Sequence, residues 1–258
     1  MIFRKKNKAE SSLELIKLSP NIITLLAICI GLFAIRMSFE GRYLESAGLV
    51  ILAAFMDAID GRLARFLNST SKFGAQLDSL ADFVNFGVTP GFVIYNWVNS
   101  FSNIKGFDWA LVLLFAICAA IRLARFNVAA ESDEGKNEIL EKYFFQGIAA
   151  PCGASLAMVP IMMTYEFGLG IYSEVYFIIS FVAIIALLMS SKVPTISIKK
   201  IPVRNDFVYA TLVFLGVILI GVILKPWYTL TVIAILYISS IPVTIYYYLK
   251  ITKNSDKN

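Results

Sequence analysis

The sequence contains no histidine among its 258 residues. This absence excludes Ser-His-Asp triads, zinc sites built on imidazole and any group transfer through a phosphohistidine. Only three cysteines are present, and Cys29, Cys118 and Cys152 each stand inside an apolar run without paired spacing. Neither a disulfide framework nor a zinc knuckle is therefore indicated. Any acid–base chemistry in this chain falls to carboxylates.

Charged residues are also scarce, at 16% of the chain against 58% hydrophobic residues. A soluble domain carries roughly 25% charged residues, so this composition indicates a protein that resides in lipid. The formal net charge of +5 would suggest a nucleic-acid partner in a soluble protein. Here membrane topology explains it, and no nucleic acid is expected as a partner.

Long apolar stretches separated by short polar ones recur along the whole chain. A helix needs about 20 such residues to cross the ~30 Å hydrocarbon layer of a bilayer. The sequence therefore predicts an all-α, polytopic membrane protein with eight spans, at approximately 22–38, 44–66, 77–98, 107–128, 147–165, 171–190, 207–224 and 228–249.

The basic residues indicate the orientation of these spans. With the amino terminus in the cytoplasm, 19 of the 23 lysines and arginines fall on the cytoplasmic side, and the others are Arg36, Arg42, Lys105 and Lys225. This asymmetry follows the positive-inside rule for an even number of spans. We expect the first span to stay as an anchor in the inner (cytoplasmic) membrane, because no cleavable signal is evident.

Four aspartates stand at the cytoplasmic ends of two adjacent spans. Asp57 and Asp60 lie near the end of the second span, and Asp78 and Asp82 open the third. A central charge costs about 2.5 to 3.5 kcal/mol on insertion scales, so such acids are functional by default. At 100° per residue, each pair lies within about 60° on one helix face. The short connection makes the helices antiparallel neighbours, and all four carboxylates can point into one cavity.

This acid quartet predicts a metal site. Four carboxylates repel one another at short range, and two divalent cations would neutralise them. Oxygen ligands without histidine or cysteine favour magnesium or manganese, and paired hard metals suit phosphoryl chemistry. The alternative is that the acids pair with Arg62 and Arg65 and merely end the spans.

Small and basic residues accompany the acids. Gly61 and Ala64 lie beside them on the helix face and leave room for a ligand, and Gly74 lies one turn before Asp78. Arg65 lies about 80° from Asp57 on the helical wheel and can reach a phosphate with its planar fork. These positions predict space for a large polar substrate.

The run Asp57-Ala-Ile-Asp60-Gly61-Arg-Leu-Ala64-Arg65, followed by Gly74, Asp78 and Asp82, resembles the complete signature of the CDP-alcohol phosphatidyltransferases. Eight specified residues fall within 26 positions, which is a highly specific match. Further segments resemble the membrane phosphatidylserine synthase branch over about residues 18–202: Ser19-Pro20-Asn21, Asp78 to Gly87, Arg122 to Asn127, and Phe145-Gln-Gly147 with Pro151. Asn85 and Ala149 depart from that pattern, where we expect serine and proline.

The resemblance implies an activity and a set of roles. The reaction would join CDP-diacylglycerol and L-serine to give phosphatidylserine and CMP. Two Mg²⁺ or Mn²⁺ ions would be held by Asp57, Asp60, Asp78 and Asp82, with Asp82 also the general base. The CDP-diacylglycerol would be held by Asn21, Thr24, Gly61, Arg65 and Ser71.

The resemblance also implies a homodimer with six core spans. The predicted organisation is a cytoplasmic segment (1–18), a catalytic six-span domain (19–202), two additional spans (203–250) and a cytoplasmic tail (251–258). The boundary between the six-span domain and the two additional spans lies in the basic linker 192–205. The active site would face the cytoplasm.

The sequence does not decide which residues bind the acceptor or which acceptor is used. Arg122 and Arg125 can bind the carboxylate of the acceptor or a lipid phosphate, or can simply extend toward headgroups. Asn85, Asn127 and Gln146 are further candidates for a serine pocket. The alternatives are a different acceptor, such as glycerol phosphate, inositol phosphate, choline or a second phosphatidylglycerol, and a divalent-metal transporter.

Overall fold

The computed structural model describes residues 8–67, 69, 71–102, 106–131, 144–168, 170, 173–196 and 208–255. The basic residues Arg4, Lys5 and Lys6, most of the polar connection 129–145 and most of the linker 192–205 lie outside these ranges. The described elements are α1 (Lys8–Phe39), α2 (Tyr43–Phe66), α3 (Lys72–Asp82), the π-helix η1 (Phe83–Val88), α4 (Thr89–Phe101), α5 (Phe107–Glu131), β1 (Phe144–Gln146), α7 (Ala150–Ala157), α8 (Val159–Phe167), α9 (Val175–Ser190), β2 (Pro194–Ile196), α10 (Val208–Leu224) and α11 (Pro226–Ser255).

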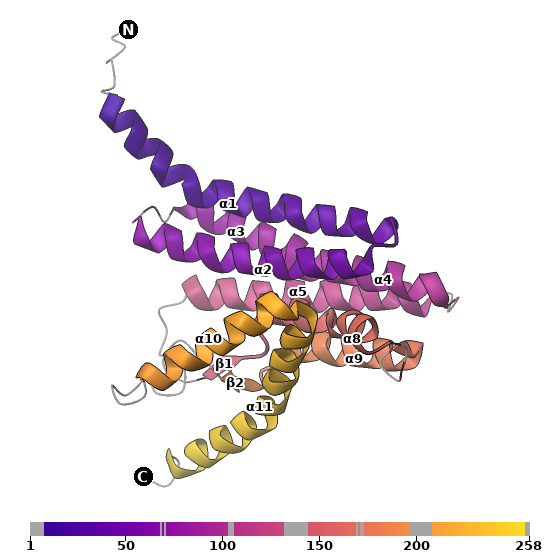
Figure 1. Cartoon of the computed structure of the whole chain (residues 1–258). Helices are drawn as coiled ribbons and strands as arrows, with labels where there is room; N and C mark the ends of the chain where they lie inside the picture. Colours follow the sequence, from indigo (N-terminus) through magenta and orange to yellow (C-terminus); the bar gives the residue numbers. More distant parts are fainter. Residues whose placement is uncertain are drawn as a thin grey trace.

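Helices lie at all eight predicted apolar stretches and pack as a layered bundle (Figure 1). Within the described ranges, three helices are long and apolar enough to cross a membrane, at Leu18–Phe39, Trp109–Ala129 and Pro226–Tyr248, and α9 and α10 contain shorter apolar stretches. The all-α, polytopic membrane class is confirmed. The number of spans stays a prediction, because the other helices carry more charge or are shorter.

Two predicted spans are not single regular helices. The third is built from α3, η1 and α4 in direct succession, with a π-helical stretch at Phe83–Val88. The fifth is broken at Met158, because Pro160 stands in the first turn of α8, where its missing N–H costs nothing. That span also begins at Ala150 instead of Gly147, whose φ of 72° is not helical.

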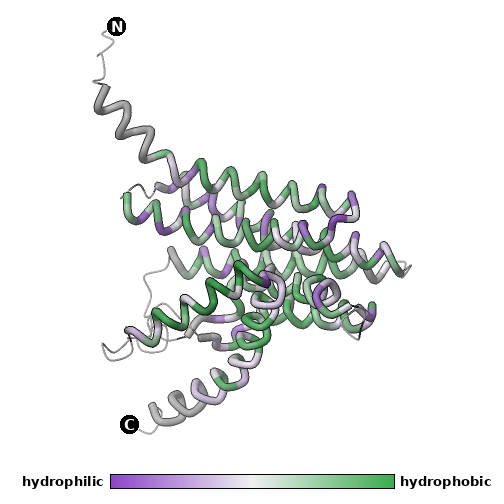
Figure 2. Tube along the Cα trace, in the orientation of Figure 1, coloured by the Kyte–Doolittle hydropathy of each residue, from purple (hydrophilic) through white to green (hydrophobic). Residues whose placement is uncertain are grey.

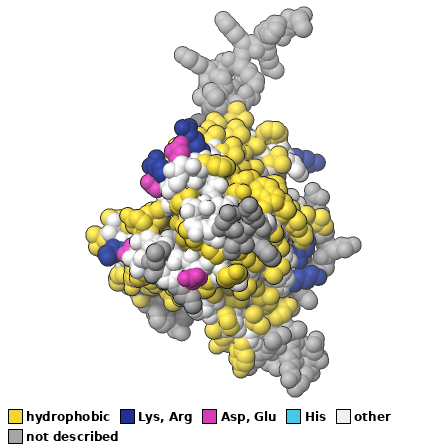
Figure 3. Space-filling view, turned by 90° about the vertical axis from the view of Figure 1, so that its right-hand side faces the viewer, with side chains coloured by type: hydrophobic (Ala, Val, Ile, Leu, Met, Phe, Trp, Pro, Cys, Tyr) yellow, Lys and Arg dark blue, Asp and Glu magenta, His cyan; other side chains and the backbone are white. Residues whose placement is uncertain are grey.

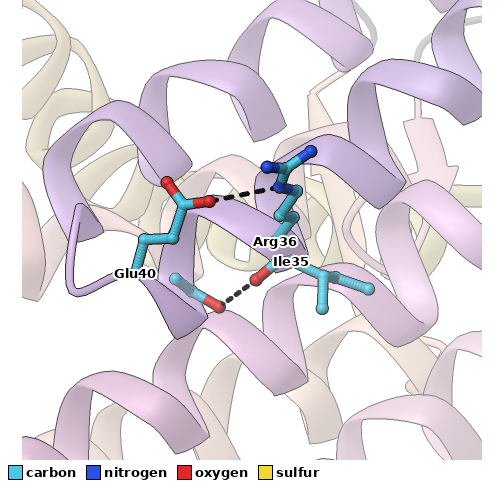
Figure 4. Close-up of polar contacts among 4 residues, drawn as sticks. Ile35, Arg36 and Glu40 are labelled. Atoms are coloured by element: carbon cyan, nitrogen blue, oxygen red, sulfur yellow. Dashed lines mark hydrogen bonds and ion pairs between the residues drawn. The ribbon is translucent and has the colours of Figure 1, made fainter.

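α1 and α2 pack side by side and are joined by a tight turn at which Gly41 has a φ of 77°. Arg36 Nε donates to Glu40 Oε1 at 3.1 Å (Figure 4), and Arg42 Nε donates to Glu45 Oε1 at 3.2 Å. Such exposed pairs contribute about 0 to 1 kcal/mol each. Figure 3 looks onto this end of the bundle and shows a few scattered charged side chains among hydrophobic ones.

The core lies between η1, α4, α5, α7, α8 and α9, where Phe86, Phe115 and Met158 are fully buried. α10 differs, since most of its large apolar side chains are exposed, and Figure 2 shows it hydrophobic along nearly its whole length. An exposed helix that is apolar all round suits contact with lipid. α11 instead joins the core: Ile241 is buried there, and a Cβ added to Gly48 of α2 would lie 2.9 Å from Trp227.

A short antiparallel strand pair was not predicted. β1 pairs with β2 so that Phe144 stands opposite Ile196 and Gln146 opposite Pro194. Gly147 N donates to Val193 O at 2.8 Å, and a Cβ on Gly147 would lie 2.8 Å from the Ser191 carbonyl oxygen. Three-residue strands are too short to show a period in sequence. The domain boundary predicted after residue 202 lies outside the described residues and stays a prediction.

Candidate functional site

Three of the four aspartates meet where α2 ends and α3 runs alongside. One carboxylate oxygen from each of Asp57, Asp60 and Asp78 lies within 4.8 Å of the others. α1 packs against both α2 and α3 and brings the two helix faces together. The structure therefore brings members of both predicted pairs of acids together.

Asp82 joins the same group from the last position of α3. Its carboxyl is in hydrogen-bonding contact with that of Asp57, and Asp78 and Arg122 are its other charged neighbours. Burial varies across the group, because Asp60 is only 3% exposed while Asp78 is exposed. The four acids thus extend from the helix packing out to the surface of the bundle.

Thr24 of α1 fixes the most buried acid. Its Oγ1 lies 2.8 Å from Asp60 Oδ2 and 3.0 Å from Pro20 O, so the hydroxyl can donate to either acceptor. Among the described residues, Asp60 Oδ1 and Asp82 Oδ1 are buried oxygens with no hydrogen-bond partner. Leaving such oxygens unsatisfied is costly, and a cation would satisfy them. Purely oxygen donors at this spacing fit a hard divalent ion.

A cleft of about 190 Å³ opens beside the acids. Asp60 and Asp78 form part of its wall, so a ligand in the cleft would lie against the carboxylates. α1, α2, α3 and the turn before α3 supply its lining: Pro20, Asn21, Thr24, Asp60, Gly61, Ala64, Ser69, Ser71, Gly74, Ala75 and Asp78. Four of the five residues expected to hold CDP-diacylglycerol, Asn21, Thr24, Gly61 and Ser71, are in this set.

Two glycines shape the cleft in different ways. A Cβ added to Gly61 would meet no atom within 4 Å, so this position leaves open space for a ligand. A Cβ on Gly74 would lie 3.0 Å from Asn21 Oδ1 and 3.1 Å from Ser71 Oγ. Gly74 thus permits the close approach of α1 and α3, and its N–H donates to Ser71 Oγ at 2.9 Å, which caps α3.

The open space at Gly61 gives a testable prediction. Gly61→Ala should leave the thermal midpoint in detergent unchanged or slightly raised, because alanine favours a helix and meets no neighbour. The same methyl group should raise the KM for a cytidine-diphosphate lipid about tenfold, since it occupies ligand space. Gly216→Ala on the largely exposed α10, where an added Cβ also meets nothing within 4 Å, is the matched control. Equal KM values for the two variants would contradict this role.

Arg65 and the two later arginines lie apart from the cleft lining. Arg65 is exposed, and its Nε donates to Gly61 O at 2.9 Å. Arg122 Nε donates to Ile148 O at 2.7 Å, while its charge faces Asp82. Arg125 donates to the Ser190 carbonyl at the end of α9. Of the two arginines expected at the acceptor side, only Arg122 therefore borders the acid group.

The other candidates for the acceptor pocket are separated from one another. Asn85 is 1% exposed and packs against α1, where a Cβ on Gly31 would lie 2.1 Å from its Oδ1. Asn127 exchanges hydrogen bonds with Ser79 of α3 at 3.1 and 3.4 Å. Gln146 lies at the end of β1 and is exposed. The sequence could not sort these roles, because each depends on which helix lies opposite.

Tyr237, Thr195 and Cys152 were missed by the sequence analysis. Tyr237 of α11 and Cys152 of α7 both lie near the Arg122 guanidinium, and Tyr237 is in hydrogen-bonding contact with Thr195 of β2. No periodic or spacing signal connects residues so far apart in the chain. Only the packing of α11 onto the strand pair brings them together.

The apolar helices and the group of four aspartates beside a cleft together define a membrane protein with an acidic site. The sequence matches the CDP-alcohol phosphatidyltransferase family over residues 17–245, and the chain belongs to that family. The match extends through α10 and most of α11.

Curated relatives cover most of the chain. A protein of Mycobacterium bovis is 35% identical over 242 residues, which are 94% of this chain and 82% of the relative. One of Helicobacter pylori is 31% identical over 223 residues, 86% of this chain and 88% of the relative. One of Methanocaldococcus jannaschii is 38% identical over 136 residues, 52% of this chain and 55% of the relative. All three are named CDP-diacylglycerol–serine O-phosphatidyltransferase.

Proposed function

We propose that this protein transfers the phosphatidyl group of CDP-diacylglycerol to L-serine, giving phosphatidylserine and CMP. The observation that carries the proposal is the meeting of Asp57, Asp60 and Asp78 beside a cleft lined by Asn21 and Gly61. Serine as the acceptor is supported by the names of relatives that align with most of the chain.

The cleft is the proposed site of the cytidine diphosphate part. Asn21, Thr24, Gly61 and Ser71 line it, and Arg65 stands one helical turn beyond Gly61. Its guanidinium is exposed and can swing toward a phosphate without breaking packing. Because Asp60 and Asp78 form part of the wall, a diphosphate bound there lies next to the acids.

The four aspartates are the proposed ligands of two Mg²⁺ or Mn²⁺ ions. Their unpaired buried oxygens, Asp60 Oδ1 and Asp82 Oδ1, are suitable donors, and no nitrogen or sulfur ligand competes in the group. When bound, such ions neutralise the diphosphate and stabilise the phosphate charge that develops on the departing CMP.

Asp82 is the proposed general base. The hydroxyl of serine is a weak nucleophile at neutral pH, so a positioned carboxylate must take its proton as attack begins. The serine oxygen bonds to the phosphorus next to diacylglycerol, the bond from that phosphorus to the CMP oxygen breaks, and CMP leaves. Asp57, Asp78 and Arg122 are all charged neighbours of Asp82, so an acceptor held by Arg122 through its carboxylate would bring its hydroxyl near Asp82.

The protein is further proposed to act in the inner membrane with the acid group facing the cytoplasm, and as a homodimer. The excess of lysine and arginine on one side supports this orientation. The homodimer rests on the family resemblance alone.

An acceptor assay tests the proposal. Purified protein in detergent, with CDP-diacylglycerol and Mg²⁺ or Mn²⁺, should release CMP when L-serine is added. Glycerol 3-phosphate, inositol phosphate and choline should give no more CMP than buffer. Release with one of these acceptors and none with L-serine would overturn serine as the substrate and keep the phosphatidyl transfer, whereas failure of every acceptor would overturn the transfer.

A further inference from the structure

Arg122 is held by a backbone carbonyl and has Asp82 as its acidic neighbour. Its Nε donates to Ile148 O at 2.7 Å, in the segment that leads from β1 into α7. The charge of Asp82 acts on it, yet no described carboxylate forms an ion pair with it within 4.0 Å. Arg122 is thus a partly buried cation near Asp82 whose Nε is held by a backbone carbonyl.

The Ile148 carbonyl, which holds Arg122, belongs to a segment that is itself fixed by hydrogen bonds. Thr195 of β2 is 3% exposed, and its hydroxyl donates to Gly147 O at 2.8 Å, one residue before Ile148. Gly147 N in turn donates to Val193 O at 2.8 Å. Gly147 has a φ of 72°, and the Leu188, Met189 and Ser191 carbonyls surround the place of a Cβ, so the segment has little freedom to move.

The C-terminal helix α11 contributes one more residue to this set of contacts. Tyr237 of α11 is in hydrogen-bonding contact with Thr195 and lies near the Arg122 guanidinium. The single proton of the Thr195 hydroxyl is used on Gly147 O, which leaves the Thr195 oxygen as the atom that the Tyr237 hydroxyl can approach. The order of contacts is thus Tyr237 to Thr195 to the Gly147 carbonyl, with Arg122 on the next carbonyl.

We propose that Tyr237 is a positioning residue that sets affinity for the amino-acid acceptor by fixing, through Thr195 and the segment Gly147–Ile148, the place of Arg122 opposite Asp82. The proposal rests on the proposed function, since it takes the acceptor to carry a carboxylate. It gives α11, which the sequence placed among two added spans of unknown purpose, a part in substrate specificity. An arginine binds a carboxylate with two parallel hydrogen bonds, so a small displacement weakens both.

Two matched pairs of variants test this role. Tyr237→Phe removes only the hydroxyl, and Tyr246→Phe on the exposed face of the same helix is its control. Thr195→Val removes the relay, and Thr195→Ser retains a hydroxyl there. Steady-state CMP release should show the KM for L-serine raised about five- to tenfold in Tyr237→Phe and Thr195→Val, with the two control variants within twofold of the unaltered protein.

Comparing the KM for L-serine with the KM for CDP-diacylglycerol separates a positioning role from a general loss of structure. The KM for CDP-diacylglycerol and the thermal midpoint should not change, and Tyr237→Phe combined with Thr195→Val should be no worse than either alone, because both break one chain of contacts. A KM for L-serine within twofold of normal, or equal rises for both substrates, would overturn the inference. If Tyr237→Phe does not fold, the Thr195 pair decides by the same criterion. An unaltered protein inactive with L-serine would instead reject the proposed function.

Discussion

Asp82→Asn is expected to lower kcat for phosphatidyl transfer at least about a hundredfold, because general-base catalysis contributes about 10² to 10⁴ in rate. Asparagine has nearly the same shape and accepts hydrogen bonds through one oxygen, but it cannot take a proton from the serine hydroxyl. The helix should be kept, since position 82 ends α3 and continues directly into η1. The measurement is CMP release at saturating L-serine and CDP-diacylglycerol.

The control for Asp82→Asn is Glu40→Gln, which removes an acid from the exposed turn between α1 and α2. That variant should keep full activity. Membrane insertion, yield in detergent and thermal midpoint should be alike for both variants. An Asp82→Asn protein that folds and turns over within threefold of normal would refute the role as base, and the proton acceptor would have to be sought among the other three acids.

Asp60→Asn is expected to abolish both activity and the stabilisation of the protein by divalent cations. Asp60 is the most buried of the acids and offers one unpaired oxygen, Oδ1, while Thr24 holds the other. A ligand at 100 times its Kd stabilises the folded state by about 2.7 kcal/mol, so Mn²⁺ should raise the thermal midpoint of the unaltered protein. Without this carboxylate the rise should disappear, and CMP release should fall at least about a hundredfold.

The matched control lies at the other end of the same helix. Glu45→Gln in the first turn of α2 removes one carboxylate that is largely exposed and pairs only with Arg42 among the described residues. Chelation by EDTA should stop CMP release by this control, and either Mg²⁺ or Mn²⁺ should restore it. Activity that survives chelation, or an Asp60→Asn protein still stabilised by Mn²⁺, would argue against a metal site at the aspartates.

Much of the candidate site was open to prediction because it depends on local spacing. Asp57 with Asp60, and Asp78 with Asp82, each fall on one face of a helix whatever surrounds it. The connection between the two helices is short, which limits where the second pair can lie. Gly61 and Ser71 stand in the same stretch of sequence as the acids, and both line the cleft beside them.

Residues of other helices were harder to assign. Arg122 and Arg125 look equivalent in sequence, yet the structure turns one toward Asp82 and the other onto the Ser190 carbonyl. A difference of three residues rotates the side chain by about 60°, which suffices to change its neighbour. Asn85 was a candidate for a substrate pocket, but it packs into the contact with Gly31.

The amino-acid sequence by itself determined the membrane class, the helical stretches and the pairs of acids, because hydrophobic length and helical period act within one segment. Tertiary structure alone decided which helices meet. Three contacts join segments far apart in the chain: that of Tyr237 with Thr195, that of Arg122 with the Ile148 carbonyl, and the pairing of β1 with β2. Such contacts depend on shape and packing between helices, and these leave no regular pattern in a single sequence.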